Sequence, residues 1–169
     1  MSTVSRWFDR HFEFAFPPDV YPNLCARLRG TPARLEELVR DCALEVLTRK
    51  PEEKWSAQEH VGHLLDLEPL WLKRVEDFVR GGPELSATDL SNRKTHEANY
   101  NAQSLEKILA DFRGARALLL ERTKDLAPAL FSRVLVHPRL KKPMRLVDHL
   151  YFVAEHDDHH LARIWELIR

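Results

Sequence analysis

The stretch from Trp55 to Pro83 reads WSAQEHVGHLLDLEPLWLKRVEDFVRGGP and has the start, the periodicity and the end of one long amphipathic helix. Ser56 is a good N-cap residue, Glu59 three positions later completes a capping box, and Trp55 stands where a hydrophobic staple falls. Residues 81–83, two glycines and a proline, end the pattern. Between these signals the apolar face is formed by Val61, Leu64, Leu65, Leu67, Trp71, Val75 and Phe78.

Three further segments carry the same periodicity, so the sequence predicts an all-α protein, a four-helix bundle. The first helix is expected from Val20 to Asp41, with a kink or break at residues 30–32 because Pro32 lacks a backbone N–H. The other two are expected at residues 102–124 and from residue 144 to the C-terminus, with a short turn at 43–48. Residues 83–101 read as a long polar loop, and residues 125–142 as irregular.

The 169 residues fit a single domain, 1–169, in which residues 1–19 form an N-terminal extension. Basic and acidic residues number 26 each, a balance that argues against nucleic-acid binding. The sequence shows neither a membrane-spanning apolar segment nor a signal peptide, so we expect a cytoplasmic protein that does not bind membranes. Cys25 and Cys42 match no metal motif and are expected to be reduced and half-buried.

Histidine is abundant, with nine residues, and two of them share one helix face. His156 and His160 are four residues apart, a spacing that lets two imidazoles bind one metal ion, and they fall near apolar positions that face the interior. A third ligand from another helix is His63 or His60, of which His63 shares the inward sector better. Three neutral imidazoles leave coordination positions open, as in catalytic sites, although an isolated histidine pair is also compatible with a polar patch.

Other candidates have weaker roles. His149 lies about 10 Å from His156 along the helix axis, too far for the same metal, and fits a polar core position. His159 is expected on the flank of its helix, and Tyr100 could reach the site from the long loop or lie in the core. Carboxylates that could orient imidazoles are Asp66, Asp157 and Asp158, the last of which also fits an exposed position; ordinary roles are expected for His11, His96 and His137.

Two motifs resemble those of the DinB/YfiT-like superfamily. Residues 54–68, KWSAQEHVGHLLDLE, are similar to its second-helix signature, and residues 156–164, HDDHHLARI, resemble its closing motif. Residues 97–102 and 136–139 also look like the family, and the resemblance spans about residues 24–169. One departure is Arg163, where many relatives have Gln, a position that is not a ligand.

The resemblance implies an up-down-down-up bundle, often a homodimer, with His63, His156 and His160 as ligands of a divalent metal such as Zn, Ni, Fe or Mn. It further implies a metal-dependent enzyme acting on a small molecule, either a transferase of low-molecular-weight thiols such as bacillithiol or mycothiol, or a hydrolase-like relative. An open metal position suits this chemistry because it lowers the pKa of a bound thiol. The alternatives are a non-catalytic protein that binds a metal or small ligand, with a possible role in stress, and a metal-free structural dimer.

Overall fold

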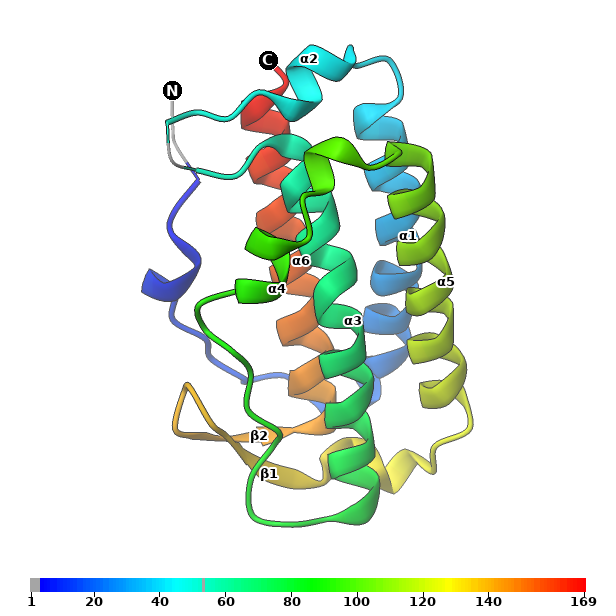
Figure 1. Ribbon diagram of the computed structural model, residues 1–169. Coiled ribbons are helices and arrows are strands. Elements are labelled where there is room, and N and C mark those ends of the chain that lie inside the picture. Colours follow the sequence, from blue (N-terminus) through cyan, green and yellow to red (C-terminus); the bar gives the residue numbers. More distant parts are fainter. Residues whose placement is uncertain (1–3, 53) are drawn as a thin grey trace.

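The computed structural model describes residues 4–52 and 54–169, and within them four long helices pack as a bundle (Figure 1). α1 (Tyr21–Val39) and α6 (Leu146–Leu167) run in one direction, and α3 (Ala57–Arg80) and α5 (Leu105–Lys124) run in the other. In chain order the helices therefore run up, down, down and up, as the resemblance implies. α3 packs against α5 and α6, and α1 packs against the same two helices.

The remaining elements lie at the two ends of this bundle (Figure 1). α2 (Leu44–Thr48) lies at one end, and the antiparallel strands β1 (Val134–His137) and β2 (Lys142–Arg145) form a hairpin at the other. Since α3 and α5 are parallel, residues 81–104 must return along the whole bundle, and this crossover carries α4 (Arg93–Glu97). Short 3₁₀ turns occur at residues 7–9, 18–20, 100–102 and 128–132.

α3 begins and ends as its sequence predicts. The Ser56 hydroxyl accepts a hydrogen bond from the backbone N–H of Glu59 at 3.1 Å, and the Glu59 carboxylate accepts one from the Ser56 N–H at 2.8 Å. At the other end Gly81 has a φ of 80°, in the region that favours glycine, and its N–H still bonds to the Asp77 carbonyl. The capping box and the glycine stop therefore set the length of this helix.

Of the two alternatives for residues 30–32, a kink or a break, the break is wrong, because α1 continues through Pro32. A proline at this position leaves the carbonyl of Leu28, one turn earlier, without its helical partner. The guanidinium of Arg116 on α5 supplies the missing donor, with Nη1 at 3.1 Å from that oxygen. A tertiary contact thus compensates for the lost backbone bond.

Two predicted irregular segments contain regular structure. The 83–101 segment, expected as a loop, includes α4, and the 125–142 segment includes β1. α5 begins at Leu105, three residues later than expected, because the Ser104 hydroxyl caps the N–H of Lys107 at 3.2 Å. The α2 turn and the half-buried free thiols of Cys25 and Cys42 match their predictions.

A buried polar layer crosses the bundle between two hydrophobic clusters. One cluster includes Leu28, Trp71 and Leu150 towards the hairpin end, and the other includes Leu35, Val61 and Ile164 towards the α2 end. The level between them is occupied by Thr31, His63, Asp66, Glu68, Arg116, His156, Asp157 and His160, all buried. Polar side chains at one level on all four helices create a place for chemistry inside the bundle.

The part of this layer around Arg116 is a network of ion pairs and hydrogen bonds. Arg116 contacts Glu68 and Asp157 at 2.6 Å each, and the Thr31 hydroxyl donates to Asp157 at 2.8 Å. A buried guanidinium that meets two carboxylates is compensated within the protein. The other part of the layer, between α3 and α6, is where the histidines lie.

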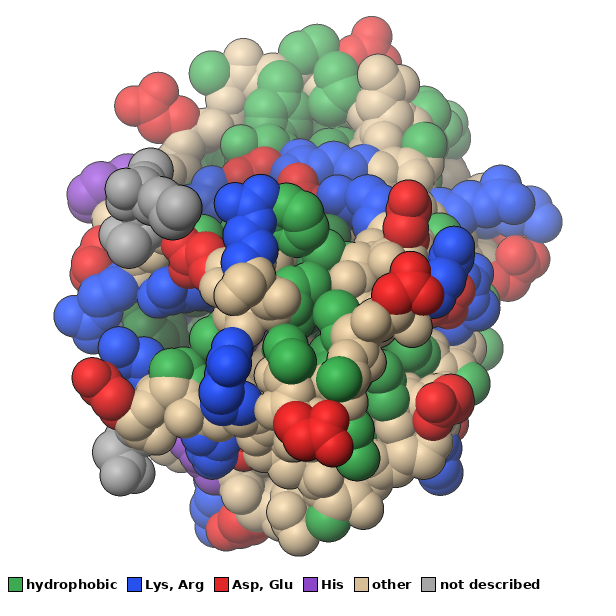
Figure 2. Space-filling view, turned by 90° about the horizontal axis from the view of Figure 1, so that it is seen from above, with side chains coloured by type: hydrophobic (Ala, Val, Ile, Leu, Met, Phe, Trp, Pro, Cys, Tyr) green, Lys and Arg blue, Asp and Glu red, His purple; other side chains and the backbone are tan. Residues whose placement is uncertain are grey.

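The exterior shows mixed charge. On the end of the bundle seen in Figure 2, basic and acidic side chains lie interspersed among hydrophobic ones. Within the described residues, every helix is too short or too polar to cross a membrane.

Candidate metal centre

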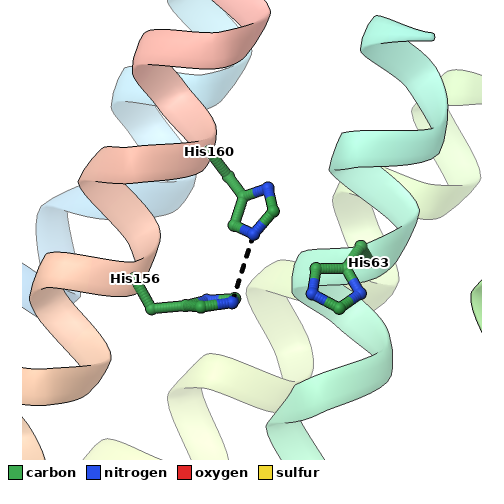
Figure 3. Close-up of side chains that lie close together, drawn as sticks. All are labelled: His63, His156 and His160. Atoms are coloured by element: carbon green, nitrogen blue, oxygen red, sulfur yellow. Dashed lines mark hydrogen bonds between the residues drawn. The ribbon is translucent and has the colours of Figure 1, made fainter. Parts of the chain in front are cut away.

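Three histidines converge between α3 and α6 (Figure 3). His63 extends from α3, and His156 and His160 extend from successive turns of α6. One ring nitrogen from each residue lies within 4.8 Å of the other two, and all three side chains are buried. The structure therefore brings together the three residues that the sequence singled out, through the i, i+4 spacing on α6 and its contact with α3.

The spacing of these nitrogens fits a shared ion. The Nε2 atoms of His156 and His160 are 3.1 Å apart. Two imidazoles about 2.0–2.1 Å from one metal, in tetrahedral or octahedral arrangement, have nitrogens roughly 2.9–3.4 Å apart. Three nitrogen donors also leave further coordination positions, which is the pattern of a site that binds substrate.

Burial keeps the cluster neutral. It lowers the pKa of His63 to about 3, with a smaller contribution from His159, and it holds the pKa of His156 and His160 well below the usual value. Neutral imidazoles have a lone pair available for a metal at physiological pH. Protons therefore do not compete with a metal ion for these imidazole nitrogens at physiological pH.

The crossover orients His63. Its Nδ1 lies 3.0 Å from the Thr95 hydroxyl, which donates to Asp66 at 2.9 Å. Since the hydroxyl proton goes to the carboxylate, the Thr95 oxygen accepts from Nδ1–H of His63, and Nε2 keeps the lone pair. Asp66 is held in turn by the Tyr100 hydroxyl at 2.7 Å and by Lys94 at 3.1 Å.

His60, the alternative third ligand, instead contacts the outer nitrogen of His160. Their Nδ1 atoms are 2.8 Å apart, so the pair shares one proton, and a donor His160 Nδ1–H leaves its Nε2 free. Trp55 covers both α3 histidines, with ring centroids 4.6 Å from His63 and 5.4 Å from His60. The staple position of Trp55 therefore serves the site rather than an apolar neighbour.

A cavity of about 570 Å³ opens on the histidines. Its tryptophan and phenylalanine lining comes from Trp7, Phe8, Trp55, Trp71 and Phe152, and Trp7 lies 5.0 Å from His156 between ring centroids. Trp7 belongs to the N-terminal segment, which runs alongside the bundle and covers this side of α6 (Figure 1). The size and apolar lining are those of a small-molecule site.

The structure decides between the alternative roles of three candidates. Asp157 does not orient an imidazole, because Arg116 and Thr31 bind it. Asp158 is partly exposed and pairs with Arg27 and Arg34. Tyr100 is buried in the core, where it reaches Asp66 and does not line the cavity.

Of the remaining histidines, His137 and His159 are buried, whereas His11 and His96 are exposed. His159, predicted on the flank, lies under Trp7 at 5.6 Å between ring centroids. His96 and His137, predicted to be ordinary, both line the cavity, whereas His11 is exposed. His149 is a core residue, as expected, and its Nε2 is 3.3 Å from the Trp71 carbonyl.

Comparison with known proteins places this geometry in a family. The model of the DinB superfamily matches residues 27–164. The structure of YfiT from Bacillus subtilis, described as a probable metal-dependent hydrolase with an unusual four-helix bundle topology, superposes with a TM-score of 0.81 at 19% identity. The match covers 94% of this chain and 91% of that one, and it shows that the two share a fold. No curated protein matches at the level of sequence.

Proposed function

The chain belongs to the DinB superfamily, and we propose that it is a divalent-metal-dependent enzyme whose metal is held by His63, His156 and His160. The observation that carries this proposal is the convergence of three buried, neutral imidazoles on one cavity. YfiT, which has the same fold, is described as a probable metal-dependent hydrolase, and this agrees with the donor set found here. Zn, Ni, Fe and Mn all suit a site rich in imidazole with open positions.

A bound divalent ion lowers the pKa of a water or thiol and so supplies a nucleophile at neutral pH. We propose a low-molecular-weight thiol as the nucleophile and a small electrophile as its acceptor. Among the described residues that line the cavity, Glu166 is the only acidic one, and it is engaged by Arg163 at 3.0 Å and by the Val4 N–H at 2.6 Å. Without a free carboxylate as general base, a thiol, which is far more acidic than water, is the better substrate.

The protein's own groups have separate tasks in this scheme. Thr95 and Asp66 fix the tautomer and direction of His63, and His60 does the same for His160. Trp7 and Trp55 cover the histidines and limit the access of water. The rest of the cavity holds the organic part of the substrates.

Hydrolysis is the second candidate, because YfiT is described as a probable metal-dependent hydrolase. The two reactions differ in their need for a cosubstrate. Thiol transfer consumes one thiol for each electrophile converted, whereas hydrolysis proceeds at the same rate without thiol. A panel of thiols with haloacetamide electrophiles, run beside a panel of small esters and amides, separates them.

Elemental analysis of the purified, untagged protein is the first test. We expect about one equivalent of a divalent transition metal, as a single three-histidine site requires. His156→Ala should lose it, while His11→Ala, which removes an exposed histidine, should retain it. Failure to bind any of the four metals after reconstitution of folded protein would refute the proposal.

A further inference from the structure

The cavity also contains a buried cation that forms no ion pair with any carboxylate of the described residues. Arg74 on α3 is 2% exposed and lines the cavity. Its Nε donates to the Ser86 carbonyl at 3.0 Å, and its Nη1 lies 3.1 Å from Nε2 of His137. Neither partner carries a negative charge, and no carboxylate of the described residues lies within ion-pair distance. Asp77 favours the charge of Arg74 only through space, because its own oxygens are bound by Arg80 and by the Ser86 N–H.

Arg116 is a buried guanidinium for which the protein does supply carboxylate partners. That side chain, equally buried, is met by two carboxylates at 2.6 Å each. Burial of an unpaired charge is unfavourable, and arginine does not escape it by losing its proton. Burial lowers the pKa of Arg74 only to about 10, so the group stays charged at neutral pH. The charge of Arg74 therefore has no carboxylate partner among the described residues.

Hydrogen-bond donors exceed acceptors around Arg74. Nη2 of Arg139, on the hairpin, is buried without a partner, and so is the indole N–H of Trp71. Nη2 of Arg74 likewise has no partner among the described residues. Both nitrogens of His137 face donors, since the backbone N–H groups of residues 139 and 140 lie 3.2 Å from its Nδ1. A carboxylate, which only accepts, complements such a site.

These hydrogen-bond donors lie close to the histidines of the metal cluster. The Trp71 ring lies 5.5 Å from the ring of His156 and 5.6 Å from Cζ of Arg74. Arg139 lies over Phe152, another cavity-lining residue, with its Cζ 5.8 Å from the ring centroid. One small molecule that extends along the indole therefore reaches both the guanidinium and the histidines.

We propose that the cavity binds a small organic carboxylate, whose carboxylate group is held by Arg74 with Arg139 as a second cation beside it, and whose body lies along Trp71 towards the histidines. A planar acceptor suits the guanidinium fork, and the aromatic lining suits an apolar body. The reaction at the histidine end rests on the function proposed above. The carboxylate site does not, because no histidine of the metal cluster takes part in it.

Calorimetric titration of the metal-free protein with 3-phenylpropionate and its neutral isostere 3-phenylpropionamide tests the site directly. The wild type should bind the acid at least tenfold more tightly than the amide. Arg74→Gln should abolish this preference, and Arg74→Lys, which keeps the charge but loses the fork, should retain part of it. Lys73→Gln, which removes a neighbouring exposed charge from the same helix, should bind as the wild type does.

The outcomes separate the two proposals. His156→Ala should lose the metal and still prefer the acid, so a failure to bind metal leaves the carboxylate site standing. Equal binding of acid and amide by the wild type would overturn the inference, as would binding of inorganic phosphate but not of the acid. If Arg74→Gln is unfolded by circular dichroism, Arg139→Gln replaces it, and an unchanged preference in that folded variant would equally refute the site.

Discussion

The substitution Gly62→Ala should destabilise the protein, although replacing glycine by alanine within a helix ordinarily stabilises a protein. Gly62 lies in α3, next to His63, and packs against the Tyr100 ring. A Cβ added there would come within 2.2–2.4 Å of three carbons of that ring. Tyr100 cannot stay in place, and its hydroxyl is the group that holds Asp66, which in turn holds Thr95.

The magnitude follows from three effects. Replacing glycine by alanine in a helix interior stabilises by about 0.5–1 kcal/mol. Overpacking a buried ring costs about 1–3 kcal/mol, and loss of the hydrogen bond to the carboxylate costs about 1.5–3 kcal/mol. The net expectation for Gly62→Ala is a loss of about 1.5–5.5 kcal/mol, which for a chain of this length lowers Tm by roughly 3–22 °C.

Gly114 provides the matched control. It lies within α5, is exposed, and a Cβ there meets no atom within 4 Å. Thermal and urea denaturation should therefore show Gly114→Ala about 0.5–1 kcal/mol more stable than the wild type, with the opposite sign to Gly62→Ala. In a Tyr100→Ala background the cost of Gly62→Ala should vanish. Equal stabilisation by both alanines would refute the packing argument.

Three further changes test the site and its surroundings. Thr95→Val should weaken metal binding about 10–100-fold, while Thr95→Ser, which keeps the hydroxyl that holds His63, should bind normally in a competition assay with a chromogenic chelator. Burial lowers the pKa of His149 to about 3, so below about pH 6.5 this imidazole binds a proton in the unfolded chain but not in the folded one. The free energy of unfolding of the metal-free protein should therefore fall, through this group, by up to about 1.4 kcal/mol for each unit by which the pH is lowered from about 6.5 to about 3. Urea unfolding at a series of pH values should show a smaller dependence on pH in His149→Leu. Arg116→Met leaves two buried carboxylates without a cation and should cost about 3–5 kcal/mol by urea unfolding; a loss under 1 kcal/mol would contradict the network.

The bundle and its histidine cluster were predictable because both depend on local spacing. The capping box at Ser56 and the glycine stop at Gly81 are read within a few residues, and the structure has both. The i, i+4 pair of His156 and His160 is likewise a property of one helix. Their meeting with His63 needed only the assumption that α3 and α6 pack together, which they do.

The residues that surround the cluster were not predictable in this way. Thr95 lies in a polar segment without periodicity, and its contact with His63 exists because the crossover passes there. Arg74 reads as a charged helix residue, and it is buried because the hairpin and the crossover cover it. Asp157 follows a histidine in the sequence, which suggests that it orients an imidazole. Both of its carboxylate oxygens instead accept hydrogen bonds from the guanidinium of Arg116 on another helix.

The unusual order of the helices explains how the site is completed. In an up-down-up-down bundle short loops join neighbouring helices, and the outer face of each helix pair stays open. Here α3 and α5 are parallel, so residues 81–104 must travel the length of the bundle (Figure 1). This path delivers Ser86 to Arg74 at one level and Thr95 to His63 at another. The same connection that makes the topology possible therefore orients a histidine of the metal cluster and holds the guanidinium of the proposed carboxylate site.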